Sequence, residues 1–189
     1  MITDDQLRTL MLSPIVRIGK RKSMTVRMLI ECTSGAMATR FKNVGKISKM
    51  YHIVADTGEH YVVPMPPLDD PDLLAKLARM LMQHLNAVAY VHMDEAWTLP
   101  KDKLPQTREE ADKIFSAGIS EHPDRVEIVV FTAEDQTGLT MAHRDIIRPQ
   151  RGKAKLGPLI FDTDDGSTMS GGAWEGRLVG MLPQRGTKQ

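Results

Sequence analysis

The sequence predicts an α+β protein with a mainly antiparallel sheet, two covering helices and a short helical and basic N-terminal segment. Three observations carry this prediction. Runs of β-forming residues joined by short turns dominate after residue 87, which favours antiparallel pairing. Residues 70–85 have the apolar spacing of an amphipathic helix. Residues 107–110 (TREE) form a capping box that begins a second helix.

Composition and charge limit the classes of protein to which the chain can belong. The 189-residue chain is 41% hydrophobic and has one cysteine, Cys32, so we expect a folded protein without an intrachain disulfide. Acidic residues near Met1 and the lack of long apolar runs argue against a signal peptide and a membrane span. We therefore expect a soluble, cytoplasmic protein.

The basic residues gather near the N-terminus. Residues 1–50 hold ten Lys/Arg and three Asp/Glu, whereas 51–146 hold eight and seventeen. We expect three parts from this asymmetry and from the turn pattern: a basic segment (1–49), an α+β core domain (50–182) and a polar tail (183–189). The two charged regions can attract each other or serve different partners.

In the N-terminal part, Thr3 can cap a short helix that Pro14 ends. Residues 15–18 and 24–31 read as strands, and 33–49 give no clear pattern. A β-hairpin is predicted over 50–65, with a two-residue turn at 57–58. That turn would place His52 and His60 on opposite faces of the sheet.

The helix over 70–85 begins with Asp70 as its cap and Pro71 at the first position, and Asn86 is suited to a left-handed cap. The helix after Thr107 ends at Gly118. The remaining apolar runs predict strands, and a turn at 135–138 would pair Val130 with His143. The predicted strands cover 87–99, 126–133, 139–147, 156–161 and 177–182.

Two short motifs combine imidazole and carboxylate groups. His92 and Asp94 stand two residues apart on a strand and so share a face, and His122 and Asp124 flank a proline in a loop. With His143 they form a candidate metal set. Each part of this set has a structural alternative. His92 and Asp94 could lie on a solvated sheet face, His122 and Asp124 could stiffen a loop, and His143 could be a buried core histidine.

Two glutamates are candidate catalytic bases for such a metal site, Glu95 and Glu134. Glu95 shares a strand face with Trp97, which we expect to pack under a helix, and a carboxyl group beside apolar surface has a raised pKa. Glu134 next to Asp135 can bind a divalent ion, but Asp135 also suits the first position of a turn.

Basic residues Lys20, Arg21 and Lys22 could contact the phosphates of a nucleic acid. Aromatic residues that would stack bases are scarce near them, and no DNA-binding motif spacing is present. A solvated surface, or one that faces an acidic partner, is the alternative.

Four motifs together resemble those of uncharacterised small proteins of bacteria and their phages, over roughly the last two-thirds of the chain. They are Glu95-Ala96-Trp97, His122-Pro123-Asp124-Arg125-x-Glu127, Ala133-Glu134-Asp135 and Leu156-Gly157-Pro158-Leu159. No activity is attached to that family, so the resemblance implies a single domain and no catalytic residue.

The leading functional prediction is a non-enzymatic intracellular protein that binds a macromolecular partner, foremost another protein, in a phage- or prophage-associated role. The alternative is a metal-dependent hydrolase of a phosphoester or nucleotide, with His92, Asp94, His122, Asp124 and His143 as ligands. The sequence leaves open whether the protein is an enzyme, and it identifies no cofactor.

Overall fold

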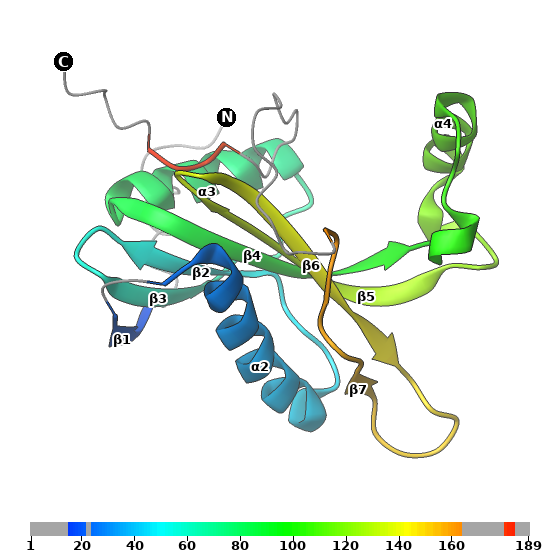
Figure 1. Cartoon of the computed structure of the whole chain (residues 1–189), viewed down its shortest axis with the longest axis horizontal. Coiled ribbons are helices and arrows are strands. Elements are labelled where there is room, and N and C mark those ends of the chain that lie inside the picture. Colours follow the sequence, from blue (N-terminus) through cyan, green and yellow to red (C-terminus); the bar gives the residue numbers. More distant parts are fainter. Residues whose placement is uncertain (1–14, 22–23, 164–179, 184–189) are drawn as a thin grey trace.

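The computed structural model describes residues 15–21, 24–163 and 180–183. Across these residues an antiparallel sheet of eight strands forms the centre of the protein (Figure 1), which confirms the α+β class. The last short strand, β8 (Ile160–Phe161), pairs with β6 (Gly138–Ile147) and lies off the main order of strands. The strands along the path follow the order β1 (Val16–Lys20), β3 (Glu59–Pro64), β2 (Met50–Ala55), β4 (Ala87–Thr98), β5 (Val126–Asp135), β6 (Gly138–Ile147) and β7 (Lys155–Leu156), with β8 at Ile160–Phe161.

The longest helix, α2 (Val26–Val44), lies where the sequence predicted a strand and an undefined segment. Thr25 caps its start by accepting a hydrogen bond from the Met28 backbone N–H, and Gly45 ends it in the left-handed region at φ 74°. Its buried side chains recur with helical spacing, from Val26 to Phe41. Residues 26–44 therefore contribute to the core.

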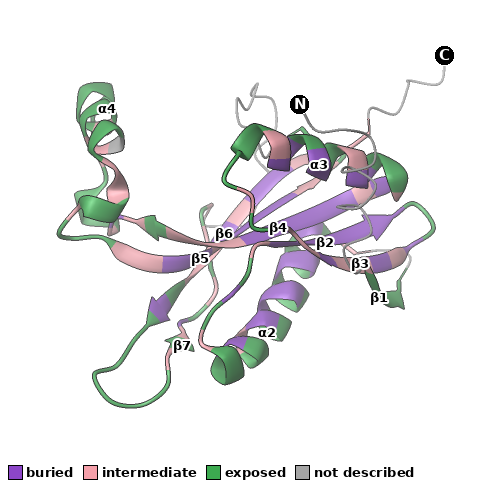
Figure 2. Ribbon diagram, turned by 180° about the vertical axis from the view of Figure 1, so that it is seen from behind, coloured by how far each residue is buried: buried purple, intermediate pink, exposed green. Residues whose placement is uncertain are grey.

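Helices α2 and α3 (Pro71–His84) cover opposite faces of the sheet (Figure 1). Side chains of α2 pack with Val91, Met93 and Phe131, whereas side chains of α3 lie in a second cluster with Tyr51 and Tyr90. Because neighbouring residues of a strand point to opposite faces, strands β2 and β4 supply residues to both clusters. Figure 2 shows the buried residues concentrated in this doubly covered region.

Helix α3 has the predicted caps. The Asp70 side chain accepts hydrogen bonds from the backbone N–H groups of Asp72 and Leu73, Pro71 opens the helix, and Asn86 follows it at φ 47°. Within the described residues, no helix is both long and apolar enough to cross a lipid bilayer.

Helix α4 (Arg108–Ala117) begins with the predicted capping box. Its Glu110 N–H donates to Thr107 Oγ1, and the Thr107 N–H donates to Glu110 Oε2. However, α4 stands away from the sheet (Figure 1), so the expectation that it covers the sheet is wrong and α2 has that role. Two short 3₁₀ turns flank α4, at Lys101–Lys103 and Ile119–Glu121.

The β2–β3 hairpin is present, but its register differs from the prediction by one residue. His52 pairs with Val62 and Val54 pairs with His60, because the turn has three residues and Gly58 occupies its left-handed position at φ 79°. A shift of one residue moves a side chain to the other face of the sheet. His52 and His60 therefore lie on the same face.

The β5–β6 hairpin has the predicted register, with Val130 opposite His143. The strand expected over 156–161 is divided into β7 and β8, because 157–159 leave the ladder. The predicted helix before Pro14 and most of the predicted strand over 177–182 lie outside the described residues.

Candidate functional site

A groove of about 850 Å³ lies at the end of the sheet that α3 does not cover. Its floor comes from β4, β5 and β6, one wall from the loop after β4, and the other wall from β8. The exposed apolar residues Leu104 and Ile160 stand on the two walls. Apolar floor residues on the α3 side of the sheet are Ala96, Val126, Ile128, Val130 and Met141.

Polar groups of the groove gather on the β6–β8 side. His143 Nδ1 lies 3.1 Å from Asp162 Oδ1, and Asp145 stands two residues further along β6. The hydrogen bond with Asp162 raises the pKa of His143, and the negative charge of Asp145 acts in the same direction. His143 therefore lines the groove and is partly exposed, and it is not a buried core histidine.

The groove combines an apolar surface with a histidine that an aspartate orients. A histidine oriented by an aspartate is half of a nucleophile-activating set. The described lining also includes the hydroxyl of Thr98 and the amine of Lys101. The chemistry offered is an apolar surface with negative charge along one side, and Lys101 on the opposite wall.

His92 and Asp94 share a face of β4, as predicted; His92 is buried, whereas Asp94 is partly exposed and forms an ion pair. His92 is 3% exposed and its ring lies 4.9 Å from that of Tyr51. Burial lowers the pKa of His92 to about 4. Asp94 pairs with Lys49, whose Nζ lies 3.1 Å from Oδ2.

His122 and Asp124 lie in the loop between α4 and β5. The Asp124 backbone N–H donates to His122 Nδ1, and Arg125 donates to the His122 carbonyl oxygen. These bonds stiffen the loop, as the structural alternative predicted, and the side chain that accepts is that of His122. Trp97 lies in contact with Arg125, with 5.0 Å from the guanidinium carbon to the ring centre, and is 42% exposed rather than packed under a helix.

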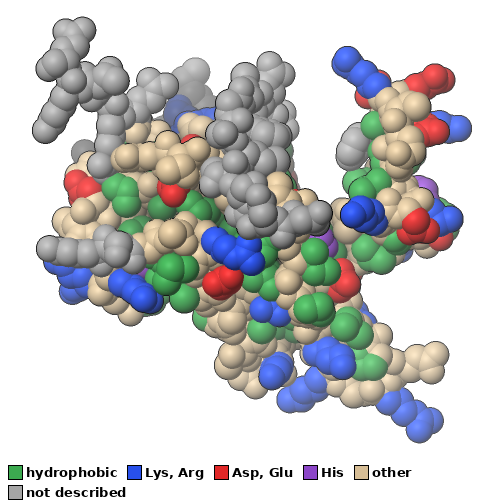
Figure 3. Space-filling model, viewed as in Figure 1, with side chains coloured by type: hydrophobic (Ala, Val, Ile, Leu, Met, Phe, Trp, Pro, Cys, Tyr) green, Lys and Arg blue, Asp and Glu red, His purple; other side chains and the backbone are tan. Residues whose placement is uncertain are grey.

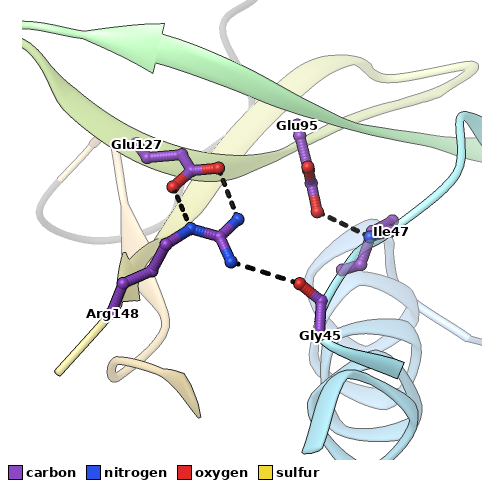
Figure 4. Close-up of polar contacts among 5 residues, drawn as sticks. All are labelled: Gly45, Ile47, Glu95, Glu127 and Arg148. Carbon is purple, nitrogen blue, oxygen red and sulfur yellow. Dashed lines mark hydrogen bonds and ion pairs between the residues drawn. The ribbon is translucent and has the colours of Figure 1, made fainter. Parts of the chain in front are cut away.

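The two predicted bases hold parts of the chain together. Glu95 accepts a hydrogen bond from the Ile47 backbone N–H at 2.6 Å, just after α2 (Figure 4). Glu134 Oε2 accepts from the Tyr90 hydroxyl at 2.5 Å and from the Gly180 backbone N–H at 2.8 Å. Asp135 accepts from the Thr137 N–H and so has the turn role.

The five predicted metal ligands are divided between a buried strand, an exposed loop and the groove. In the described part of the chain, no three His, Cys, Asp or Glu side chains come close enough to hold a metal ion. The predicted metal set is thus not assembled by the residues that the structure describes.

The sequence did not predict the buried pair of imidazoles, because the predicted register of the β2–β3 hairpin differs from the observed one by one residue. His52 Nε2 lies 3.0 Å from His60 Nδ1, and His52 Nδ1 lies 2.6 Å from Thr33 Oγ1 of α2. Burial, and then the charge of His60, lower the pKa of His52 to about 4. The three-residue turn with its glycine is the sequence signal that could have revealed this pair. The single cysteine, Cys32, lies exposed on α2.

Comparisons with known proteins do not add to this geometry. No protein-family model matches the chain, no curated protein matches its sequence, and no solved structure matches its fold.

Proposed function

We propose that this protein has a non-enzymatic role and binds a segment of a protein partner in the groove between β8 and the loop after β4. The segment would present an apolar side chain to the groove floor and a lysine or arginine to its acidic side. The observation that carries the proposal is the groove itself, an apolar recess of about 850 Å³ with negative charge on one wall.

The apolar residues of the groove support this role. Leu104 and Ile160 are 44% and 42% exposed on opposite walls, so a partner side chain between them would remove apolar surface from water on both sides. Buried apolar anchors in such recesses supply most of the affinity in protein interfaces.

The charges of the groove support a basic partner. The negative potential of Asp145 and Asp162 that favours protonated His143 would favour a lysine or arginine at the same place. The two carboxylates would determine which partner binds and in which orientation more than how tightly it binds, because they stand at a partly exposed edge of the groove.

A displayed library of random short peptides tests the proposal. Val130→Trp fills the groove floor, and Val16→Trp places the same side chain on exposed β1 as a matched control. Peptides enriched on the native protein should combine an apolar with a basic residue. They should lose about tenfold or more in affinity on the first variant and none on the second.

The decisive comparison uses labelled enriched peptides in fluorescence polarisation, with circular dichroism to verify that both variants fold. Asp145→Asn should weaken the basic peptides more than their uncharged analogues. Equal binding to the native protein and to Val130→Trp would refute the groove as the site. Enrichment without basic residues would refute the proposed partner chemistry.

A further inference from the structure

The chain between β6 and β7 is strongly basic. Residues 148–155 (RPQRGKAK) contain four Lys/Arg and no acidic residue. Pro149 and Gly152, the latter at φ 104°, shape this loop. The side chains of Arg151, Lys153 and Lys155 are exposed.

The end of α2 adds further positive charge beside this loop. Arg148 Nη1 donates to the carbonyl oxygen of Gly45, the residue that ends α2, and β7 packs along the same helix (Figure 4). Lys42 and Lys46 are exposed on either side of Gly45. Figure 3 shows Lys and Arg side chains gathered over the β6–β7 loop on the visible face. We call this group the basic surface: Lys42, Lys46, Arg151, Lys153 and Lys155.

The base of the loop is held by a separate ion pair. Arg148 binds Glu127 through two hydrogen bonds of 2.6 Å, so its charge is already matched. In the described ranges, none of the five residues of the basic surface forms an ion pair with a carboxylate. Their charges are available to a partner.

We propose that the basic surface binds the phosphate backbone of a double-stranded nucleic acid. Lysine and arginine on an exposed loop contact phosphates without reading the sequence. Single-strand binding would call for aromatic stacking platforms, and residues 148–155 contain no aromatic residue. This surface is independent of the groove and of the partner proposed for it.

The basic surface is better suited to phosphate than the N-terminal residues that the sequence pointed to. Arg17 Nη2 lies 3.1 Å from Glu59 Oε1, and the charge of Lys20 also acts on Glu59. This carboxylate offsets part of the positive charge at that edge of the sheet, where Lys20 and Arg21 lie. Lys22 is outside the described residues.

The number of charges sets the expected dependence on salt. If the five cations each displace one condensed counterion, the logarithm of the association constant falls against the logarithm of salt concentration with a slope of about −4.5. Between ~50 mM and ~200 mM salt, the affinity then falls about 500-fold.

Fluorescence anisotropy with labelled duplex DNA and duplex RNA tests this proposal. The loop variant Arg151→Gln/Lys153→Gln/Lys155→Gln removes three of the five charges, so the slope should decrease to about −1.8. The edge variant Lys20→Gln/Arg21→Gln is the matched control and should retain the native slope. All substituted residues are exposed, so both variants should keep the native circular dichroism spectrum.

Three results would overturn the proposal. They are no duplex binding at low salt, a native slope in the loop variant, or polyglutamate bound as tightly as the duplexes at equal charge concentration. The last result would assign the basic surface to an acidic protein. None of them bears on the groove, because the peptide measurements use different residues and a different ligand.

Discussion

Replacing His52 by glutamine should reduce the sensitivity of the fold to mild acid. The His52 imidazole is 5% exposed and lies between Thr33 of α2 and His60 of β3. A proton added here would place a charge in a buried site next to a second imidazole, at the contact between α2 and the sheet. Glutamine retains a donor and an acceptor but does not titrate.

The direction of the effect follows from the pKa. The pKa of His52 falls from 6.5 to about 4 on folding, so the unfolded chain binds the proton more readily than the folded one. The stabilisation is therefore complete above about pH 6.5 and is lost as the pH falls toward 4. Each pKa unit corresponds to ~1.4 kcal/mol, which gives a loss of about 2 kcal/mol at pH 5 and about 3 kcal/mol near pH 4.

Urea unfolding followed by circular dichroism between pH 7.5 and 4.5 measures this loss. The native protein should lose stability across this range. The His52→Gln variant should lose about half as much free energy of unfolding over this pH range as the native protein. The other half remains, because the pKa of His92 is lowered to a similar value. His84→Gln, on the exposed end of α3, is the control and should follow the native curve. A native free energy of unfolding that is the same at pH 7.5 and pH 5 would refute the reasoning.

Three further substitutions test contacts that hold the fold. Arg148→Gln removes the exposed pair with Glu127 and should cost about 1 kcal/mol in urea unfolding, less at high salt. Glu134→Ala removes the carboxylate that accepts from the Tyr90 hydroxyl and the Gly180 N–H and should cost about 2 kcal/mol in thermal unfolding; an unchanged midpoint would contradict this. Gly45→Ala forces a side chain into φ 74° and should cost about 1 kcal/mol, whereas exposed Gly35→Ala within α2 should not destabilise.

The sequence by itself determined the features that depend on neighbouring residues. Asp70, Pro71 and Asn86 marked the ends of α3, Thr107 marked the start of α4, and the turn after Asp135 set the register of β5 and β6. In each case the decisive contacts join residues a few positions apart, so the local pattern contains them.

Helix α2 depended on contacts that the local pattern does not contain. Its β-forming start and the polar Thr33 and Ser34 on its buried side interrupt the apolar stripe. Ser34 becomes favourable there because it meets Arg144 of β6, 110 residues away. Helical structure is selected when such an element packs on the sheet.

Only the tertiary structure decided which side chains meet. A turn longer by one residue brought His52 and His60 together, and strand order placed His143 beside Asp162 in the groove. The same folding brought the end of α2 to the β6–β7 loop, which joined basic residues more than 100 positions apart. Such groupings depend on the burial of distant apolar faces against one another, and the spacing of residues along the chain does not contain that information.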